Sequence, residues 1–191
     1  MAHSINWIND NAEKNLETVG RKSLESTISD LEKYLNIGSF DISGLLEIDL
    51  SNDLKEQINT EVKENELQLD DTFDSLSDSL QDEIREYLQE EFGNYGLSFD
   101  YVEIDENIDQ DYFRYQLSWG GPSSEIRFYE NGAIEYVYMD WFCGIGFNVN
   151  GDSTFKLLFD YFTDLGMLDF EAKRGEYDYY TILAEKEVSE D

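Results

Sequence analysis

Between residues 71 and 92, two rows of side chains follow the same four-residue spacing. The apolar row consists of Leu76, Leu80, Ile84 and Leu88. The acidic row consists of Asp74, Asp78, Asp82, Glu86 and Glu90. A single α-helix places one such row against a core and the other in water. The spacing therefore predicts an amphipathic helix over roughly 71–92, ended by Gly93-Asn94.

The acidic row is unusual for a surface helix because each carboxylate has another carboxylate as its neighbour four residues away. Each like-charge neighbour at this spacing costs roughly 0.2–0.5 kcal/mol, and only Arg85 interrupts the row. The row would extend about 24 Å. B-DNA also presents dense negative charge, about one charge per 1.7 Å of helix axis. Two interpretations follow: the row imitates a phosphate backbone, or it is a solvated face that maintains solubility.

The distribution of charge favours the first interpretation. The chain has a formal net charge of -31, and residues 51–111 contain 20 acidic residues against three basic ones. A chain that is 40% hydrophobic and 15% aromatic should fold, which excludes an acidic disordered tract. Adaptation to high salt would also give a negative surface, but it would spread the carboxylates broadly and not concentrate them in one row. The candidate partner-binding residues are Asp70, Asp71, Asp74, Asp78, Asp82, Glu86, Glu90, Asp105 and Asp109.

The first half of the chain has the periodicity of further helices. Apolar residues recur at helical spacing over 4–19 and again over 24–35, which predicts two helices, and Gly38 can end the second. The segment 40–50 is expected to be irregular or briefly extended. Ser51 is then expected to cap a third helix.

Beyond Gly96 the apolar spacing changes to two, which is typical of half-buried antiparallel strands. We expect a sheet from Leu97 to Phe147, with a turn at Asn131-Gly132. Trp119 and Trp141 end alternating aromatic runs, so both are expected to be largely buried.

The remaining pattern completes the predicted fold. A helix over 153–165 should cover the sheet, and residues 167–184 are predicted to form a C-terminal hairpin. The fold class is therefore α+β, with N-terminal helices followed by an antiparallel β-meander and a covering helix. Residues 1–93 form a helical acidic region and residues 94–191 an aromatic-rich sheet with a helix, either as two parts or as one continuous domain.

The sequence argues against an enzyme, and we assign no catalytic, cofactor-binding or metal-binding residue. His3 is the only histidine, so Ser-His and Cys-His arrangements lack their base. The alternation of Asp105, Asn107, Asp109 and Asp111 resembles the opening of a calcium loop, but the required glycine and bidentate glutamate are absent. Cys143 suggests a small buried thiol.

The chain shows neither a signal peptide nor an apolar stretch of about 20 residues. We therefore expect no membrane association and a cytoplasmic location.

The segment Ser118-Trp119-Gly120-Gly121-Pro122-Ser123, followed by Asp140-Trp141-Phe142, resembles a pattern in small, largely uncharacterised phage and plasmid proteins. The resemblance implies origin on a mobile element and therefore a host-cell cytoplasm. Small acidic proteins of such elements resemble anti-restriction or anti-CRISPR inhibitors that mimic DNA. No active residue carries over from the resemblance.

Two functional hypotheses remain. In the first, the protein is a DNA mimic that inhibits a host defence enzyme by occupying its basic DNA-binding surface. In the second, it is an acidic immunity or regulatory protein that binds a basic nuclease toxin without mimicking DNA. Both predict a basic nucleic-acid-binding protein as partner and no direct binding of nucleic acid, because the net charge repels phosphates. A homodimer would lengthen a mimic surface.

Overall fold

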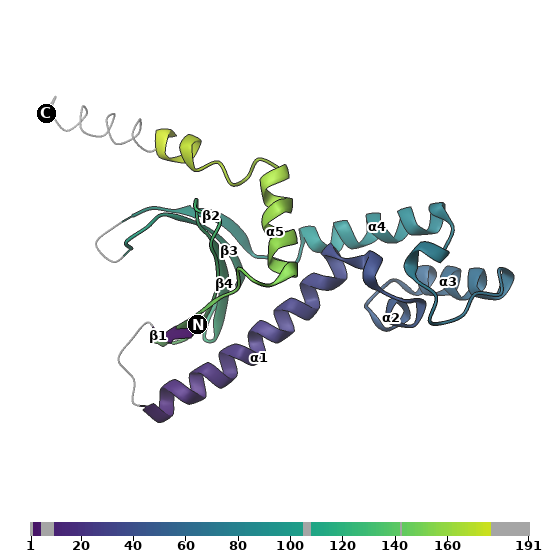
Figure 1. Cartoon of the computed structure of the whole chain (residues 1–191), viewed down its shortest axis with the longest axis horizontal. Helices are drawn as coiled ribbons and strands as arrows, with labels where there is room; N and C mark the ends of the chain where they lie inside the picture. The colour runs from purple at the N-terminus through teal and green to yellow at the C-terminus, as the bar shows by residue number, and fades with distance from the viewer. Residues whose placement is uncertain (1, 5–9, 105–107, 142, 177–191) are drawn as a thin grey trace, which may run out of the picture.

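The computed structural model describes residues 2–4, 10–104, 108–141 and 143–176 (Figure 1). The helices are α1 (Asp10–Leu35), α2 (Ile42–Glu47), α3 (Asn52–Glu64), α4 (Asp78–Gly93) and α5 (Ser153–Asp164), with short 3₁₀ helices η1 (Ile37–Ser39) and η2 (Phe73–Ser75). The strands are β1 (Ala2–Ser4), β2 (Ser98–Val102), β3 (Tyr112–Ser118), β4 (Ser123–Phe128), β5 (Ile134–Asp140) and β6 (Cys143–Asn148). The predicted α+β class is confirmed.

The six strands form one antiparallel sheet in the order β1-β6-β5-β4-β3-β2. Strands β2 to β6 are a meander, and the period-two pattern identifies β2 to β5 among them. Between β4 and β5, Gly132 has the positive φ of 79° that its turn requires. The pairing of β1 with β6 was not predicted, because three residues are too few to show a period.

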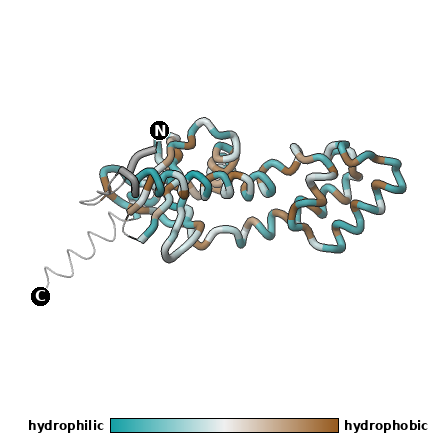
Figure 2. Tube along the Cα trace, turned by 90° about the horizontal axis from the view of Figure 1, so that it is seen from below, coloured by the Kyte–Doolittle hydropathy of each residue, from teal (hydrophilic) through white to brown (hydrophobic). Residues whose placement is uncertain are grey.

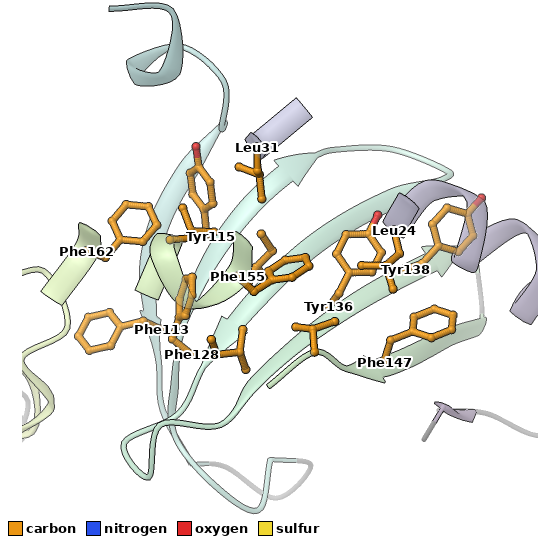
Figure 3. Packing of buried hydrophobic residues seen from close by; sticks show 14 of the residues in the cluster. Leu24, Leu31, Phe113, Tyr115, Phe128, Tyr136, Tyr138, Phe147, Phe155 and Phe162 are labelled. Atoms are coloured by element: carbon orange, nitrogen blue, oxygen red, sulfur yellow. The ribbon is translucent and has the colours of Figure 1, made fainter. Parts of the chain in front are cut away.

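One face of the sheet is aromatic and packs against α1 and α5. Figure 3 shows side chains from the strands, such as Phe128 and Tyr136, meeting Leu24 and Leu31 of α1 and Phe155 of α5. These residues belong to one apolar core. We call α1, α5 and the six strands the sheet lobe.

The helix α1 is continuous where the sequence predicts two helices, over 4–19 and 24–35. Its interior contains Gly20, at which a Cβ atom would lie 3.0 Å from side-chain carbons of β6. The hydroxyl groups of Ser23 and Tyr136 are 2.8 Å apart and share a hydrogen bond. Gly20 and Ser23, which lie between the two predicted helices, therefore both contact the sheet. A glycine costs a helix about 1 kcal/mol, which close packing along α1 can offset.

Residues 37–93 form a second lobe with an apolar core of its own, built from α2, α3, α4 and the segments between them. We call these residues the arm. Figures 1 and 2 show the arm extending from the sheet lobe along the long axis of the molecule. Ser51 accepts a hydrogen bond from the Leu54 amide at 3.2 Å, as predicted for the cap of the third helix. The segment 40–50, expected to be irregular or briefly extended, instead contains α2, which Asp41 caps by accepting a hydrogen bond from the Gly44 amide at 2.7 Å.

The acidic helix is shorter than predicted. It ends at Gly93 as expected, but it begins at Asp78, and residues 73–75 form η2 instead. Ser77, the residue before α4, donates hydrogen bonds from its amide and its hydroxyl to the carboxylate of Glu61 on α3. This contact with α3 helps to fix where α4 begins. The helical periodicity of the sequence gives no sign of it.

The prediction that Trp119 and Trp141 are buried is wrong. Their exposed fractions are 69% and 76%, because both lie in the turns beyond the strand ends, where alternation no longer sets which way a side chain points. Cys143 is half-buried and its thiol donates to the Asp140 carbonyl at 3.3 Å.

The predicted C-terminal hairpin over 167–184 is also wrong where the structure describes it, because residues 170–176 are helical. The ring of Phe170 packs edge-on against Phe113, with ring centroids 4.8 Å apart. Arg174 donates to both carboxylate oxygens of Glu130, at 3.0 and 2.8 Å, and to Asp111 at 2.7 Å. Residues 177–184 lie outside the described residues.

The Asp111 carboxylate should make stability depend on pH. The hydrogen bond from Arg174 lowers its pKa against the opposing effect of burial, and the Tyr101 hydroxyl, 2.6 Å away, lowers it further. A carboxyl group with a lowered pKa in the folded state contributes stability at neutral pH, and this contribution is lost as the pH falls below about 4. In urea titrations we expect Asp111→Asn to be less stable than the wild type at pH 7, with the difference narrowing below pH 4. Parallel pH profiles would contradict this.

Candidate functional surface

The arm concentrates carboxylates on its surface. Residues 37–93 contain 17 acidic and three basic residues, a net charge of -14. Fifteen of the acidic residues are exposed, and the other two, Asp71 and Glu61, are half-buried. The apolar side chains that would otherwise face water fill the core of the arm, so the two kinds of residue are separated as the sequence predicts.

The structure separates the predicted row into two parts. Asp78, Asp82, Glu86 and Glu90 are exposed at four-residue intervals along α4 and span about 18 Å of its axis. Asp74 is exposed but lies in η2, before the helix. The row on α4 is therefore one residue shorter than the sequence suggests.

The other predicted contact residues lie around the row or apart from it. Asp70 is exposed, whereas Asp71 accepts a hydrogen bond from the Gln68 amide at 2.7 Å and so holds a local turn. Asp109 is exposed in the loop between β2 and β3, outside the arm. Asp105 lies outside the described residues.

The acidic surface extends from α4 onto α3, where sequence reasoning named no site residue. Asp53, Glu56, Glu61 and Glu64 line a groove of about 590 Å³ together with residues at the start of α4. They occupy positions of α3 other than those of the buried Leu54 and Ile58, an amphipathic pattern that was present in the sequence. On the α4 side, Glu83 accepts a hydrogen bond from Gln57 at 3.1 Å.

The arm neutralises little of its own charge. Within the described residues, Asp82 is the only acidic residue of the arm with an ion pair, and it is 3.4 Å from Arg85 with its side chain 80% exposed. The Arg85 guanidinium also lies over the Phe73 ring at 4.8 Å and donates to Gln81 at 3.1 Å. The pKa of Tyr87 is raised, first by desolvation and then by nearby carboxylates, which is the effect expected in a negative field.

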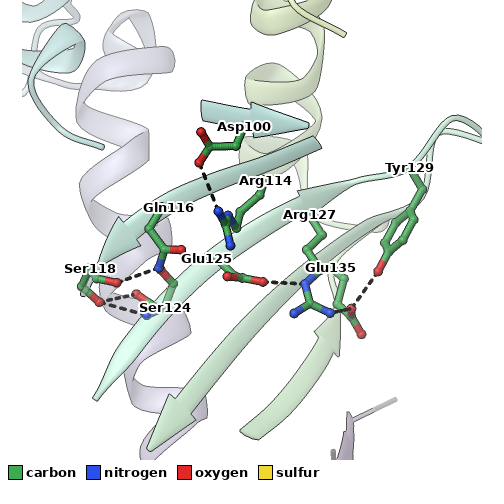
Figure 4. A network of polar contacts seen from close by, with 9 residues as sticks. All are labelled: Asp100, Arg114, Gln116, Ser118, Ser124, Glu125, Arg127, Tyr129 and Glu135. Atoms are coloured by element: carbon green, nitrogen blue, oxygen red, sulfur yellow. Dashed lines mark hydrogen bonds and ion pairs between the residues drawn. The ribbon is translucent and has the colours of Figure 1, made fainter. Parts of the chain in front are cut away.

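The sheet lobe uses its carboxylates differently. On the sheet face opposite α1 and α5, Arg127 donates to Glu125 at 2.6 Å and lies 3.8 Å from Glu135 (Figure 4). Asp100 similarly accepts from Arg114 at 3.2 Å. Acids and bases thus pair on this face, whereas among the described residues of the arm Asp82 is the one acidic residue with an ion pair.

Comparisons with protein-family models, with curated proteins and with solved structures found no match to the chain. Among the described residues, no helix is both long and apolar enough to cross a membrane. The described part of the chain also contains no group of three or more His, Cys, Asp or Glu side chains that could hold a metal ion. Of the calcium-like residues, Asp105 and Asn107 are not described, and Asp111 pairs with Arg174.

The spacing on α4 predicts how stability responds to charge removal. Replacing Asp82, Glu86 and Glu90 with the corresponding amides removes three repulsive neighbour contacts and should raise the free energy of unfolding by about 1 kcal/mol. Asp78 is retained because a carboxylate in the first helical turn is favourable. Urea denaturation at low salt measures the change.

A matched control removes three exposed carboxylates from the sheet lobe, by Glu25→Gln, Asp160→Asn and Asp164→Asn. This control has the same net charge but removes only one repulsive neighbour contact, between Asp160 and Asp164 on α5, against three along α4, so it should gain less stability. An equal or larger gain in the control would show that repulsion along α4 is not a significant cost.

Proposed function

We propose that the arm is a DNA-mimicking surface, through which the protein binds a basic nucleic-acid-binding protein of a host defence system and inhibits it. One observation carries the proposal: the arm has a net charge of -14, with all of its acidic side chains at or near the surface of a lobe that has its own core. Function then lies in binding and not in catalysis.

Charge density decides how much of the arm such a mimic needs. The row on α4 alone presents about one charge per 6 Å, well below the one per 1.7 Å of duplex DNA. The whole arm has a net charge of -14, and α4, with 16 residues, is about 24 Å long. Distributed over that length, the charge is about one per 1.7 Å, which is comparable to duplex DNA. Only the carboxylates of the whole arm together reach this density, so the mimic surface must extend beyond α4 to the rest of the arm.

The lobe also supports mimicry by holding its charges in place. The carboxylates of α3 and α4 are attached to helices that pack on one another through buried Leu54, Ile58, Leu80 and Ile84. A surface that is ordered before binding loses less conformational entropy on association than a flexible acidic tract. Electrostatic steering would in addition speed the encounter with a basic partner. The resemblance to proteins of mobile elements is consistent with an inhibitor of this kind acting in the host cytoplasm.

The proposal is tested first by affinity capture from bacterial lysate, with the captured protein purified and titrated with duplex DNA. A mimic should compete with DNA for the partner. If the partner binds this protein and DNA at once, mimicry is wrong and the protein is instead an acidic immunity or regulatory protein.

The triple amide variant on α4 tests the surface itself. Loss of three charges should weaken the complex at least tenfold, because each contact contributes about 0.5–1 kcal/mol or more, and it should flatten the salt dependence of the affinity. Isothermal titration calorimetry between 50 and 200 mM salt measures both. The matched sheet-lobe control should bind like the wild type. If both variants lose affinity equally, the partner responds to net charge and not to the arm.

A further inference from the structure

Two exposed tryptophans lie at the same end of the sheet. Trp119 is in the turn between β3 and β4, and Trp141 is in the turn between β5 and β6. The indole of Trp141 lies against Gly121 in the first turn, where an added Cβ atom would be 2.9 Å from an indole carbon. The two turns are therefore in contact.

Trp141 is a costly residue for the fold at its position. It has a φ of 52°, in the left-handed region where a side chain with a Cβ atom costs roughly 1–2 kcal/mol and where asparagine or glycine is preferred. An indole stabilises a fold when it is buried, but this one is 76% exposed. Strain of this kind is concentrated at functional sites.

The chain itself shows what chemistry these rings accommodate. The guanidinium carbon of Arg114 lies 6.0 Å from the centroid of the Trp119 ring, in the range of a cation–π contact. Arg114 is held from the other side by Asp100 at 3.2 Å. Figure 4 shows Arg114 and Asp100 on the sheet face opposite the helices. Trp119 thus already packs against one arginine and remains 69% exposed.

The charge around the two indole rings determines which kind of group can bind to their exposed faces. The exposed carboxylate of Asp140 directly precedes Trp141, and the chain as a whole has a net charge of -31. Anions are repelled from such a surface and cations are attracted to it. Among cationic side chains, the planar guanidinium of arginine stacks on indole better than the compact ammonium of lysine does.

We propose that Trp119 and Trp141 form a second contact surface, which binds arginine side chains of a basic protein partner. This inference rests on the proposed function for the nature of the partner, but it concerns a different part of the molecule from the arm. It assigns the arm to long-range charge attraction and the two rings to short-range recognition of arginine.

The probes for the test are fluorescently labelled nona-arginine and nona-lysine peptides, titrated at physiological salt and followed by fluorescence anisotropy. The variants are Trp119→Ala and Trp141→Asn, singly and together. Asparagine is chosen at position 141 because it tolerates the left-handed conformation, so this variant should fold at least as well as the wild type. Circular dichroism and urea denaturation verify folding. The triple amide variant on α4 is the comparison for charge.

Each tryptophan replacement should weaken binding of nona-arginine about two- to fivefold and change binding of nona-lysine less, although net charge is unaltered. The α4 variant should weaken binding of both peptides by the same factor. A double tryptophan variant that keeps the wild-type affinity for nona-arginine and the wild-type preference over nona-lysine would overturn the proposal. So would sedimentation showing that the rings mediate self-association without any preference for arginine.

The two proposals fail separately. If the tryptophan variants bind the captured partner normally while the α4 variant does not, the arm remains the binding surface and the tryptophan surface is wrong. If tryptophan variants lose the partner and the α4 variant does not, the mimic is wrong.

Discussion

The apolar core beneath α3 and α4 is the interaction on which the acidic arm depends. Repulsion between carboxylates four residues apart costs only a few tenths of a kcal/mol for each neighbour. Full burial of a Leu, Ile or Phe side chain contributes about 1.5–3 kcal/mol. Ile58, Phe73 and Ile84 are completely buried in this core. The core therefore holds together helices whose surfaces repel one another, and the arm can keep its charge without basic residues to neutralise it.

The arm is joined to the sheet lobe through aromatic packing at the end of α4. Phe92, in the last turn of α4, belongs to the core of the sheet lobe, whereas Leu88, one turn earlier, belongs to the core of the arm. Tyr34 at the end of α1 contacts both cores, and its ring centroid lies 5.6 Å from that of Phe92. Two helices thus cross from one core to the other, so the carboxylates of the arm have a fixed relation to the sheet.

Much of this fold was accessible from the sequence, because periodicity reports burial over several residues. The period of two identified strands β2 to β5, and helical spacing identified α3, α4 and α5 to within a few residues. The errors occur where a single contact determines where a helix begins or whether it continues. The hydrogen bonds from Ser77 to Glu61 mark the start of α4, which leaves Asp74 outside the helical row. The continuity of α1 depends on how closely Gly20 packs against β6.

For the candidate surface too, the sequence revealed what lies within one helix and missed what depends on contacts between elements. The row on α4 was visible because one helix carries it, whereas its extension onto α3 depends on which faces of two helices lie together. The tryptophans were misplaced because their burial was extrapolated from strands into turns. The hydropathy of a tryptophan does not distinguish a core residue from one held out to meet a partner.

Concentrating like charge on a folded lobe has a consequence for how the free and bound forms respond to their surroundings. Dissolved cations screen the repulsion within the arm, so added salt should stabilise the unbound protein while it weakens attraction to a basic partner. The proposed basic partner would supply the same screening from fixed positions and so act as a counterion. The arm would then be most stable inside its complex, and dissociation would require small ions to take over the partner's role.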